Sequence, residues 1–102
     1  MLKYKVRREK RSQVPVFDFK DKKYALLGEL LLAEGRNFGT EIISFLRRCE
    51  GAGEFAGNVF RLEVADGRVR VVNDITDKEC AVEVGELISI FKDYTNVKGV
   101  GK

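Results

Sequence analysis

The sequence predicts an α+β fold, with an antiparallel β-sheet of about five to six strands and two helices packed on one face. Three observations predict this class. Several segments alternate apolar and polar residues with the period of a strand. Two others repeat apolar residues with the period of a helix. The dipeptide Asp66-Gly67 lies between two alternating segments, as in a tight hairpin. The 102 residues, 44% of them hydrophobic, suffice for one domain, which we place at residues 1–95, with a flexible C-terminal tail over 96–102.

Two strands are predicted at the N-terminal end. Residues 2–8 alternate apolar and basic side chains, which is typical of a strand with one face in solvent. Residues 14–19 are rich in β-branched and aromatic side chains. Because Pro15 cannot donate a hydrogen bond to a ladder, we expect this second strand to lie at an edge or to begin there.

Residues 24–33 fit two interpretations. Their leucines and alanines suit a helix, whereas Gly28 in its middle would cost about 1 kcal/mol. A strand with a bulge or a close backbone approach at Gly28 explains the glycine better. We therefore predict a strand, with a helix as the alternative, and a turn at Glu34-Gly35-Arg36.

Two helices follow from apolar periodicity. The first is predicted over residues 38–49, with Asn37 as its cap and one apolar stripe made of Phe38, Ile42, Phe45, Leu46 and Cys49. The second is predicted from Gly85 to about Tyr94, with Glu86 in its first turn, where a negative charge suits the helix dipole.

The hairpin over residues 58–73 has a predicted register. A two-residue loop at Asp66-Gly67 pairs Ala65 with Arg68 and sets Glu63 across from Arg70 on a solvent-facing side. The other side is apolar and is expected to be buried: Phe60, Leu62, Val64, Val69 and Val71. A polar loop over 74–79 and a further strand over 80–84 complete the pattern.

The residue types favour a binding protein over an enzyme. Histidine is absent, which removes the commonest general base and the most frequent transition-metal ligand. Cys49 and Cys80 are too few for a disulfide framework or a four-thiolate zinc site, so we expect free thiols in a reducing cytoplasm. The glycines do not match the sequence motif of a phosphate-binding loop, which also requires a lysine. No apolar run approaches the roughly 18 residues that cross a bilayer. We expect no catalytic residue, metal, cofactor or membrane partner.

The N-terminal segment is strongly basic. Residues 1–23 hold nine lysines and arginines against three acids, although the net charge of the whole chain is +3. Lys3, Lys5, Arg7 and Arg8 could bind nucleic acid, or they could form the solvated face of an edge strand. An exposed stacking platform would need aromatic residues on the charged face, and this segment has none there.

The acidic residues concentrate nearer the C-terminus. Residues 74–93 hold six acids against two lysines. This stretch is either a solvated loop or a surface that docks a basic partner. In the second interpretation the candidate partner-binding residues are Asp74, Asp77, Glu79, Glu83 and Glu86.

Four segments resemble small bacterial immunity proteins of contact-dependent growth inhibition and related polymorphic toxin systems. They are Leu-Leu-Gly-Glu-Leu-Leu-Leu (26–32), Asn-Phe-Gly-Thr-Glu-Ile-Ile-Ser-Phe-Leu (37–46), Gly-Asn-Val-Phe-Arg-Leu-Glu-Val (57–64) and Cys-Ala-Val-Glu-Val-Gly-Glu-Leu-Ile (80–88). The resemblance implies a cytoplasmic antitoxin that binds a cognate toxin domain, often a nuclease. The chain departs from this family pattern in being net basic, whereas inhibitors of basic nucleases are often acidic. Because residues 74–93 are acidic, we expect a toxin to bind at the loop over 74–79 and the start of the second helix. The alternative function is a small nucleic-acid-binding module that uses the basic N-terminal strand.

Overall fold

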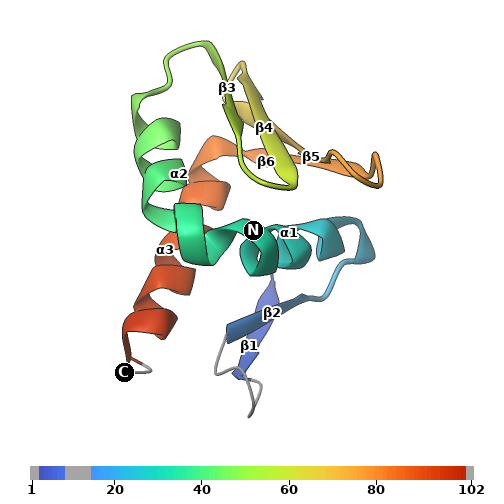
Figure 1. Ribbon diagram of the computed structural model, residues 1–102, viewed down its shortest axis with the longest axis vertical. Helices are drawn as coiled ribbons and strands as arrows, with labels where there is room; N and C mark the ends of the chain where they lie inside the picture. The colour runs from blue at the N-terminus through green and yellow to red at the C-terminus, as the bar shows by residue number, and fades with distance from the viewer. Residues whose placement is uncertain (1–2, 9–14, 101–102) are drawn as a thin grey trace.

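The computed structural model describes residues 3–8 and 15–100, and its fold is α+β, as predicted. The described strands form two antiparallel sheets instead of one. One sheet pairs β1 (Tyr4–Arg8) with β2 (Pro15–Phe19), and the other has four strands. Figure 1 shows the first helical segment between the two sheets and the other helices along one side. Leu2, Val14 and residues 101–102 of the predicted tail lie outside the described residues.

The central hairpin confirms the predicted register. Strand β4 (Phe60–Ala65) pairs with β5 (Arg68–Asn73), with Ala65 opposite Arg68 and Glu63 opposite Arg70. All five apolar side chains expected on the inner face are buried. The prediction succeeds because a two-residue loop fixes the register locally.

Two further strands extend this hairpin on either side. Strand β3 (Ala52–Ala56) pairs with β4, and β6 (Glu79–Glu83) pairs with β5. The resulting four-stranded sheet turns one face toward the helices. This inner face joins a core that includes Leu27, Leu46 and Phe91 from the helical segments.

The strand predicted over residues 24–33 is wrong, because this segment is helical. A 3-10 turn (Lys22–Tyr24) leads into α1 (Ala25–Leu30), a π-helical turn (Leu31–Gly35) and α2 (Arg36–Arg48) without interruption. A Cβ atom at Gly28 would lie 2.7 Å from the backbone oxygen of Phe17. The glycine therefore reflects close packing of the helix on β2, the close approach that the sequence suggested but within a different element.

The predicted turn at residues 34–36 and the predicted cap at Asn37 are also wrong. The backbone is helical at Gly35 and Arg36, so α2 continues the preceding π-helical turn and needs no new cap. The side chain of Glu34 is 1% exposed. Its carboxylate accepts hydrogen bonds from the backbone N–H groups of Asn58 (3.0 Å), Val59 (2.7 Å) and Phe60 (2.7 Å). Glu34 thus fastens the helical layer to the β3–β4 turn.

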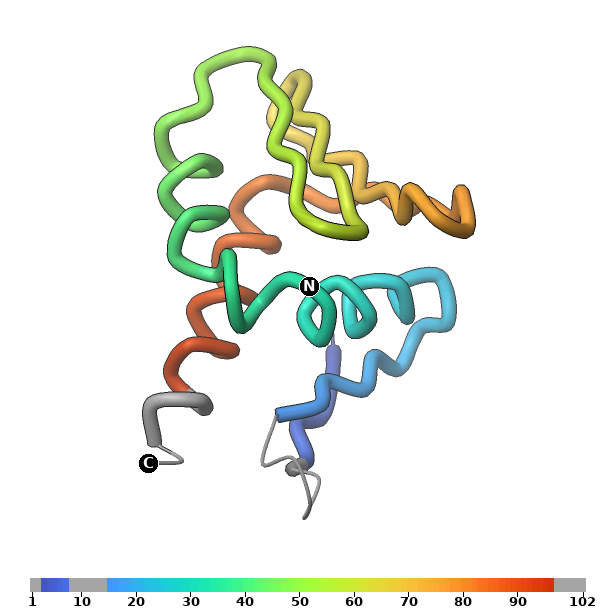
Figure 2. Tube along the Cα trace, viewed as in Figure 1, coloured from blue at the N-terminus to red at the C-terminus, as the bar shows by residue number. Residues whose placement is uncertain are grey.

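The last helix, α3 (Val84–Val100), is longer than predicted. It starts directly after β6 and packs against α2 and the π-helical turn. The Tyr4 hydroxyl donates a hydrogen bond to Asp93, which ties β1 to α3. The Cα trace in Figure 2 shows the four-stranded sheet and the β1–β2 ribbon at opposite ends of the molecule.

Candidate functional site

One face of the four-stranded sheet is left uncovered by the helices of the described residues. Side chains alternate between the two faces of a strand, and α1, α2 and α3 pack on the inner face. We call the other face the outer sheet face. Its side chains are Ala52, Glu54, Ala56, Arg61, Glu63, Ala65, Arg68, Arg70, Val72, Glu79, Ala81 and Glu83.

Arg70 is an ion-pair centre of this face. Its guanidinium lies 2.9 Å from a Glu63 oxygen and donates two hydrogen bonds to Glu79, at 2.6 and 3.1 Å. Hydrogen bonding to Arg70 lowers the pKa of the Glu79 carboxyl below its usual range. Glu79 therefore stays ionised at neutral pH while it is held by an arginine of the same chain.

Arg61 is a second ion-pair centre. Its guanidinium lies 3.2 Å from Glu63, 3.4 Å from Asp74 and 4.0 Å from Glu54. With Asp74 included, the outer sheet face carries five carboxylates and three arginines. It is therefore acidic, although part of its charge is compensated internally.

The loop between β5 and β6 is held by Asn73, which is buried. The Asn73 side-chain oxygen accepts hydrogen bonds from the N–H groups of Ile75 (2.9 Å) and Thr76 (3.1 Å). The Asn73 backbone bonds to Asp77 and Lys78. The backbone N–H of Asp74 donates to Val59, at 2.8 Å. These contacts define one loop conformation.

This braced loop presents an apolar side chain to solvent. Ile75 is 75% exposed, more than the other two large hydrophobic side chains exposed among the described residues, Leu32 (49%) and Val6 (39%). An apolar anchor within a charged rim is the usual composition of a protein-binding hot spot. We therefore take the loop 74–78 and the adjoining outer sheet face as the candidate site.

The structure separates the predicted acidic residues into two groups. Asp74, Asp77 and Glu79 lie in or beside the β5–β6 loop. Glu83 lies at the other end of β6, roughly 13 Å along the strand from Glu79, and Glu86 lies in the first turn of α3. Asp77 is exposed, with a positive φ of 64°, whereas Asp74 and Glu79 are already paired with arginines.

Sequence reasoning missed both Ile75 and Asn73. The signals were present: an isolated isoleucine in an otherwise polar loop, preceded by an asparagine able to form an Asx turn. Neither signal separates an exposed isoleucine from a buried one. That distinction depends on how the loop leaves the sheet.

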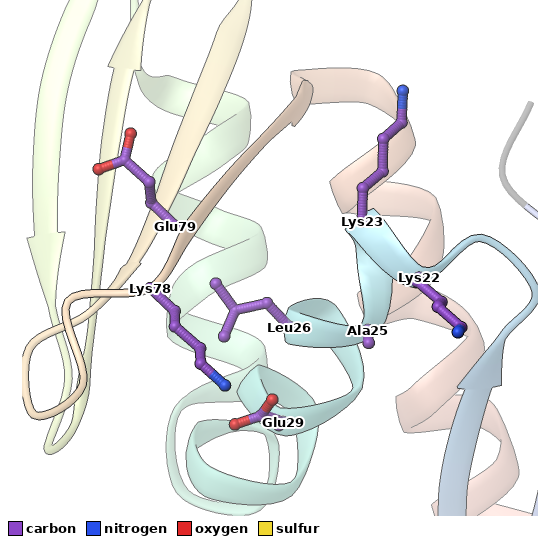
Figure 3. A pocket seen from close by; sticks show the side chains of 7 residues that line it. All are labelled: Lys22, Lys23, Ala25, Leu26, Glu29, Lys78 and Glu79. Carbon is purple, nitrogen blue, oxygen red and sulfur yellow. The ribbon is translucent and has the colours of Figure 1, made fainter.

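A hollow of about 310 Å³ lies next to this loop, between α1 and the start of β6. Figure 3 shows that the Lys78 side chain extends toward Glu29, whereas Lys22 and Lys23 point away from the hollow. The lysines do not converge, so we assign no anion site here.

The predicted basic residues lie on the β1–β2 ribbon. Lys3, Lys5 and Arg7 alternate with Tyr4 along the strand, and the Lys20 N–H donates to the Lys3 carbonyl, which adds Lys20 to this end of the ribbon. Arg7 is paired with Asp18 at 2.7 Å. The Arg8 side chain lies outside the described part of the chain.

The aromatic side chains of the ribbon face the core. Tyr4 packs on Phe17 and Phe19, with ring centroids 5.0 and 5.1 Å apart. The tyrosine therefore belongs to the inner side of the ribbon and supplies no stacking platform on its basic side, as expected from the alternation.

Cysteine and acidic side chains are the remaining groups that could carry chemistry. Cys49 and Cys80 are both free thiols, as predicted, and burial raises the pKa of Cys80 to about 11. Among the described residues, no three histidine, cysteine or acidic side chains are grouped to hold a metal ion. Over the same part of the chain, no helix combines the length and apolar character needed to cross a membrane.

Comparison with known proteins finds no matching family model, no significant match among curated proteins and none among solved structures.

Proposed function

We propose that this chain is an immunity protein, a non-enzymatic binding domain that docks on a cognate toxin domain and blocks it. The resemblance of four segments to bacterial immunity proteins suggests the class. Ile75 supports a protein-binding role most directly, because a braced loop holds this side chain 75% exposed. Burying it fully in a partner would contribute about 1.5–3 kcal/mol to binding.

The charge around Ile75 supports a partner with a basic surface. Asp74 and Asp77 flank it, and the outer sheet face beside it has an acidic excess. A complementary toxin surface would therefore have an apolar pocket with a basic rim. The rim charges would mainly accelerate association, and the isoleucine would anchor the loop in the apolar pocket.

Substitution of Ile75 tests this function. In cells that produce the cognate toxin domain, we expect Ile75→Asp to abolish protection and to weaken the purified complex at least about tenfold. The melting temperature should stay within a few degrees, because most of the side chain is exposed in the free protein. Unlike alanine at Asp74 and Glu79, this change leaves the ion pairs of Arg61 and Arg70 intact.

Leu32→Asp is the matched control. Leu32 is an exposed hydrophobic residue of the π-helical turn and does not belong to the loop 74–78. This variant should protect cells as well as the wild type does. Full protection by Ile75→Asp, or equal loss by both variants, would contradict the assignment of the loop.

One observation favours the second candidate function, nucleic-acid binding. Lys20 joins Lys3 and Lys5 at one end of the β1–β2 ribbon, which enlarges the basic patch predicted from sequence. The supporting measurement would be salt-sensitive retardation of mixed DNA or RNA that disappears when these three lysines become alanine.

A further inference from the structure

Strand β3 leaves one edge of the four-stranded sheet open. It pairs with β4, and within residues 3–8 and 15–100 no strand lies on its other side. An open edge presents unpaired backbone groups, which can accept another strand. Sheets commonly protect such edges with lysine, proline or a bulge. Strand β3 has the sequence Ala-Gly-Glu-Phe-Ala and contains neither lysine nor proline.

The register shows which backbone groups are free. Gly57 donates to Phe60 (2.8 Å), and Asp66 donates to Gly51 (3.3 Å). Hydrogen-bonded pairs alternate along an antiparallel ladder, so every second residue of β3 bonds to β4, starting from these two pairs. The N–H and C=O groups of Glu54 and Ala56 therefore point away from the sheet.

An apolar groove of about 500 Å³ runs beside the first half of this edge. Phe45 and Cys49 line it from the C-terminal end of α2, and Gly53 lines it from β3. Its charged lining residues are Arg48, Glu50 and Glu54. An extended segment beside β3 would direct alternate side chains into this groove and the intervening ones onto the outer sheet face.

We propose that the β3 edge binds an extended peptide segment by strand addition, and that this segment alternates apolar and basic residues. The residue opposite Glu54 would share its acidic face, where carboxylates outnumber arginines by five to three. The residues on either side would place apolar side chains in the groove beside Phe45. This is the recognition mode in which the main chain supplies affinity and the alternate side chains supply specificity.

Charge complementarity distinguishes this occupant from a second copy of the chain. A second β3 would bring another Glu54 and the same acidic excess alongside the first, and like charges across strands destabilise pairing. The β3 edge is also separate from the Ile75 loop, since β3 and β6 are opposite edges of the sheet. The proposal therefore holds whether or not the partner is a toxin.

The test uses the full chain and a synthetic peptide, acetylated and amidated Lys-Val-Lys-Val-Lys. Its binding is followed by the NMR signals and hydrogen exchange of individual backbone amides. With peptide at about ten times its dissociation constant, exchange at the amides of Glu54 and Ala56 should slow about tenfold, because the free fraction alone exchanges. The acidic peptide Glu-Val-Glu-Val-Glu should bind at least about tenfold more weakly.

Two proline variants locate the binding edge. The Ala56 N–H points outward from β3. By the same alternation, counted from the bond between the Asn73 N–H and the Lys78 carbonyl, the Ala81 N–H points outward from β6. Proline is tolerated at such positions because the lost donor faces solvent. Ala56→Pro should abolish peptide binding, whereas Ala81→Pro should bind as the wild type does, with both folds confirmed by amide spectra.

Several results would overturn the proposal. One is an unchanged spectrum at Glu54 and Ala56 with the basic peptide at roughly 5 mM, a concentration that detects even weak strand addition. Another is loss of binding in Ala81→Pro but not in Ala56→Pro. A third is a wild-type dimer that Ala56→Pro converts to a monomer, which would assign the edge to a second copy. If Ala56→Pro fails to fold, Glu54→Lys replaces it and should reverse the preference between the two peptides.

Discussion

Glu34 forms one of the most specific contacts between the helical layer and the four-stranded sheet. Its carboxylate accepts three backbone N–H groups from the β3–β4 turn, and a Cβ atom at Gly57 would lie 2.6 Å from it. A buried charge is costly unless hydrogen bonds replace its hydration. Three charge-assisted bonds do so here, and they fix the turn against the π-helical turn.

Replacement of Glu34 tests this contact. In Glu34→Gln an amide group replaces one carboxylate oxygen and confronts backbone donors, so at least one buried N–H loses its acceptor. We expect a loss of about 2–4 kcal/mol in the free energy of unfolding, measured by urea denaturation. Glu29→Gln on the exposed side of α1 is the control and should cost less than about 0.5 kcal/mol. Equal stability of the two variants would show that Glu34 is dispensable.

The sequence does not reveal the role of Glu34. The tripeptide Glu34-Gly35-Arg36 has the composition of a turn. The backbone groups that the Glu34 carboxylate binds lie 24 to 26 residues further along the chain. Gly35 is equally misleading, because a Cβ atom there would lie 2.9 Å from the Tyr94 ring. Both residues are explained by tertiary packing, which local composition cannot predict.

At the scale of elements, the hairpin and the first helical segment behave differently. The β4–β5 register depends on Asp66-Gly67 and on alternation within 14 residues, so the sequence predicts it correctly. Residues 24–33 are helical because their leucines pack between two sheets. Gly28 lowers the helix propensity of this segment, but a glycine is needed there because the Phe17 backbone oxygen on β2 leaves no room for a Cβ atom.

Two glycine-to-alanine substitutions separate propensity from packing. Alanine favours a helix over glycine by about 1 kcal/mol in open space. Gly28→Ala should nonetheless destabilise the protein, because the new methyl group would meet the Phe17 backbone oxygen, which cannot rotate away. Gly85→Ala, near the start of α3 with nothing within 4 Å of the added atom, should stabilise it by about 0.4–1 kcal/mol. In thermal unfolding, the melting temperature should fall for Gly28→Ala and rise for Gly85→Ala. Stabilisation by Gly28→Ala would refute the packing argument.

The candidate site was predictable in part. The acidic composition of 74–93 is visible in the sequence, and so is the pairing of Glu63 with Arg70 across the hairpin. The bond between Glu79 and Arg70 was not predictable, because the five-residue loop before β6 leaves the β5–β6 register open. In the structure Asp74 and Glu79 are paired with arginines, so the exposed Ile75 becomes the main candidate for partner contact.

At the scale of the whole molecule, α1 lies between the two sheets and contacts both β2 and β5. This arrangement explains why two sheets are observed instead of the predicted one, because α1 lies between the strands of the two sheets and keeps them from pairing. It also separates the basic β1–β2 ribbon from the acidic outer sheet face (Figure 1). A partner approaching either end meets an excess of one sign of charge, although the net charge is only +3.

Three groups in different elements make the whole fold sensitive to alkaline pH. Burial raises the pKa of the Cys80 thiol on β6 to about 11 and raises that of the Tyr94 phenol on α3. Burial, together with the neighbouring Asp93, also raises the pKa of Tyr4 on β1. All three groups are neutral when protonated. Ionisation is therefore easier in the unfolded chain, so the free energy of unfolding decreases as pH rises.

The pH dependence of unfolding checks this coupling. Below about pH 9, the usual value for a thiol, the Cys80 contribution should be fully present, and it should be lost as pH rises toward 11. The phenols should extend the loss to higher pH. The urea midpoint of the wild type should therefore fall between pH 9 and 11, and that of Cys80→Ala should fall less steeply, because this variant has no thiol to ionise. Parallel curves for the two proteins would show that Cys80 ionises as easily in the folded state as in the unfolded chain.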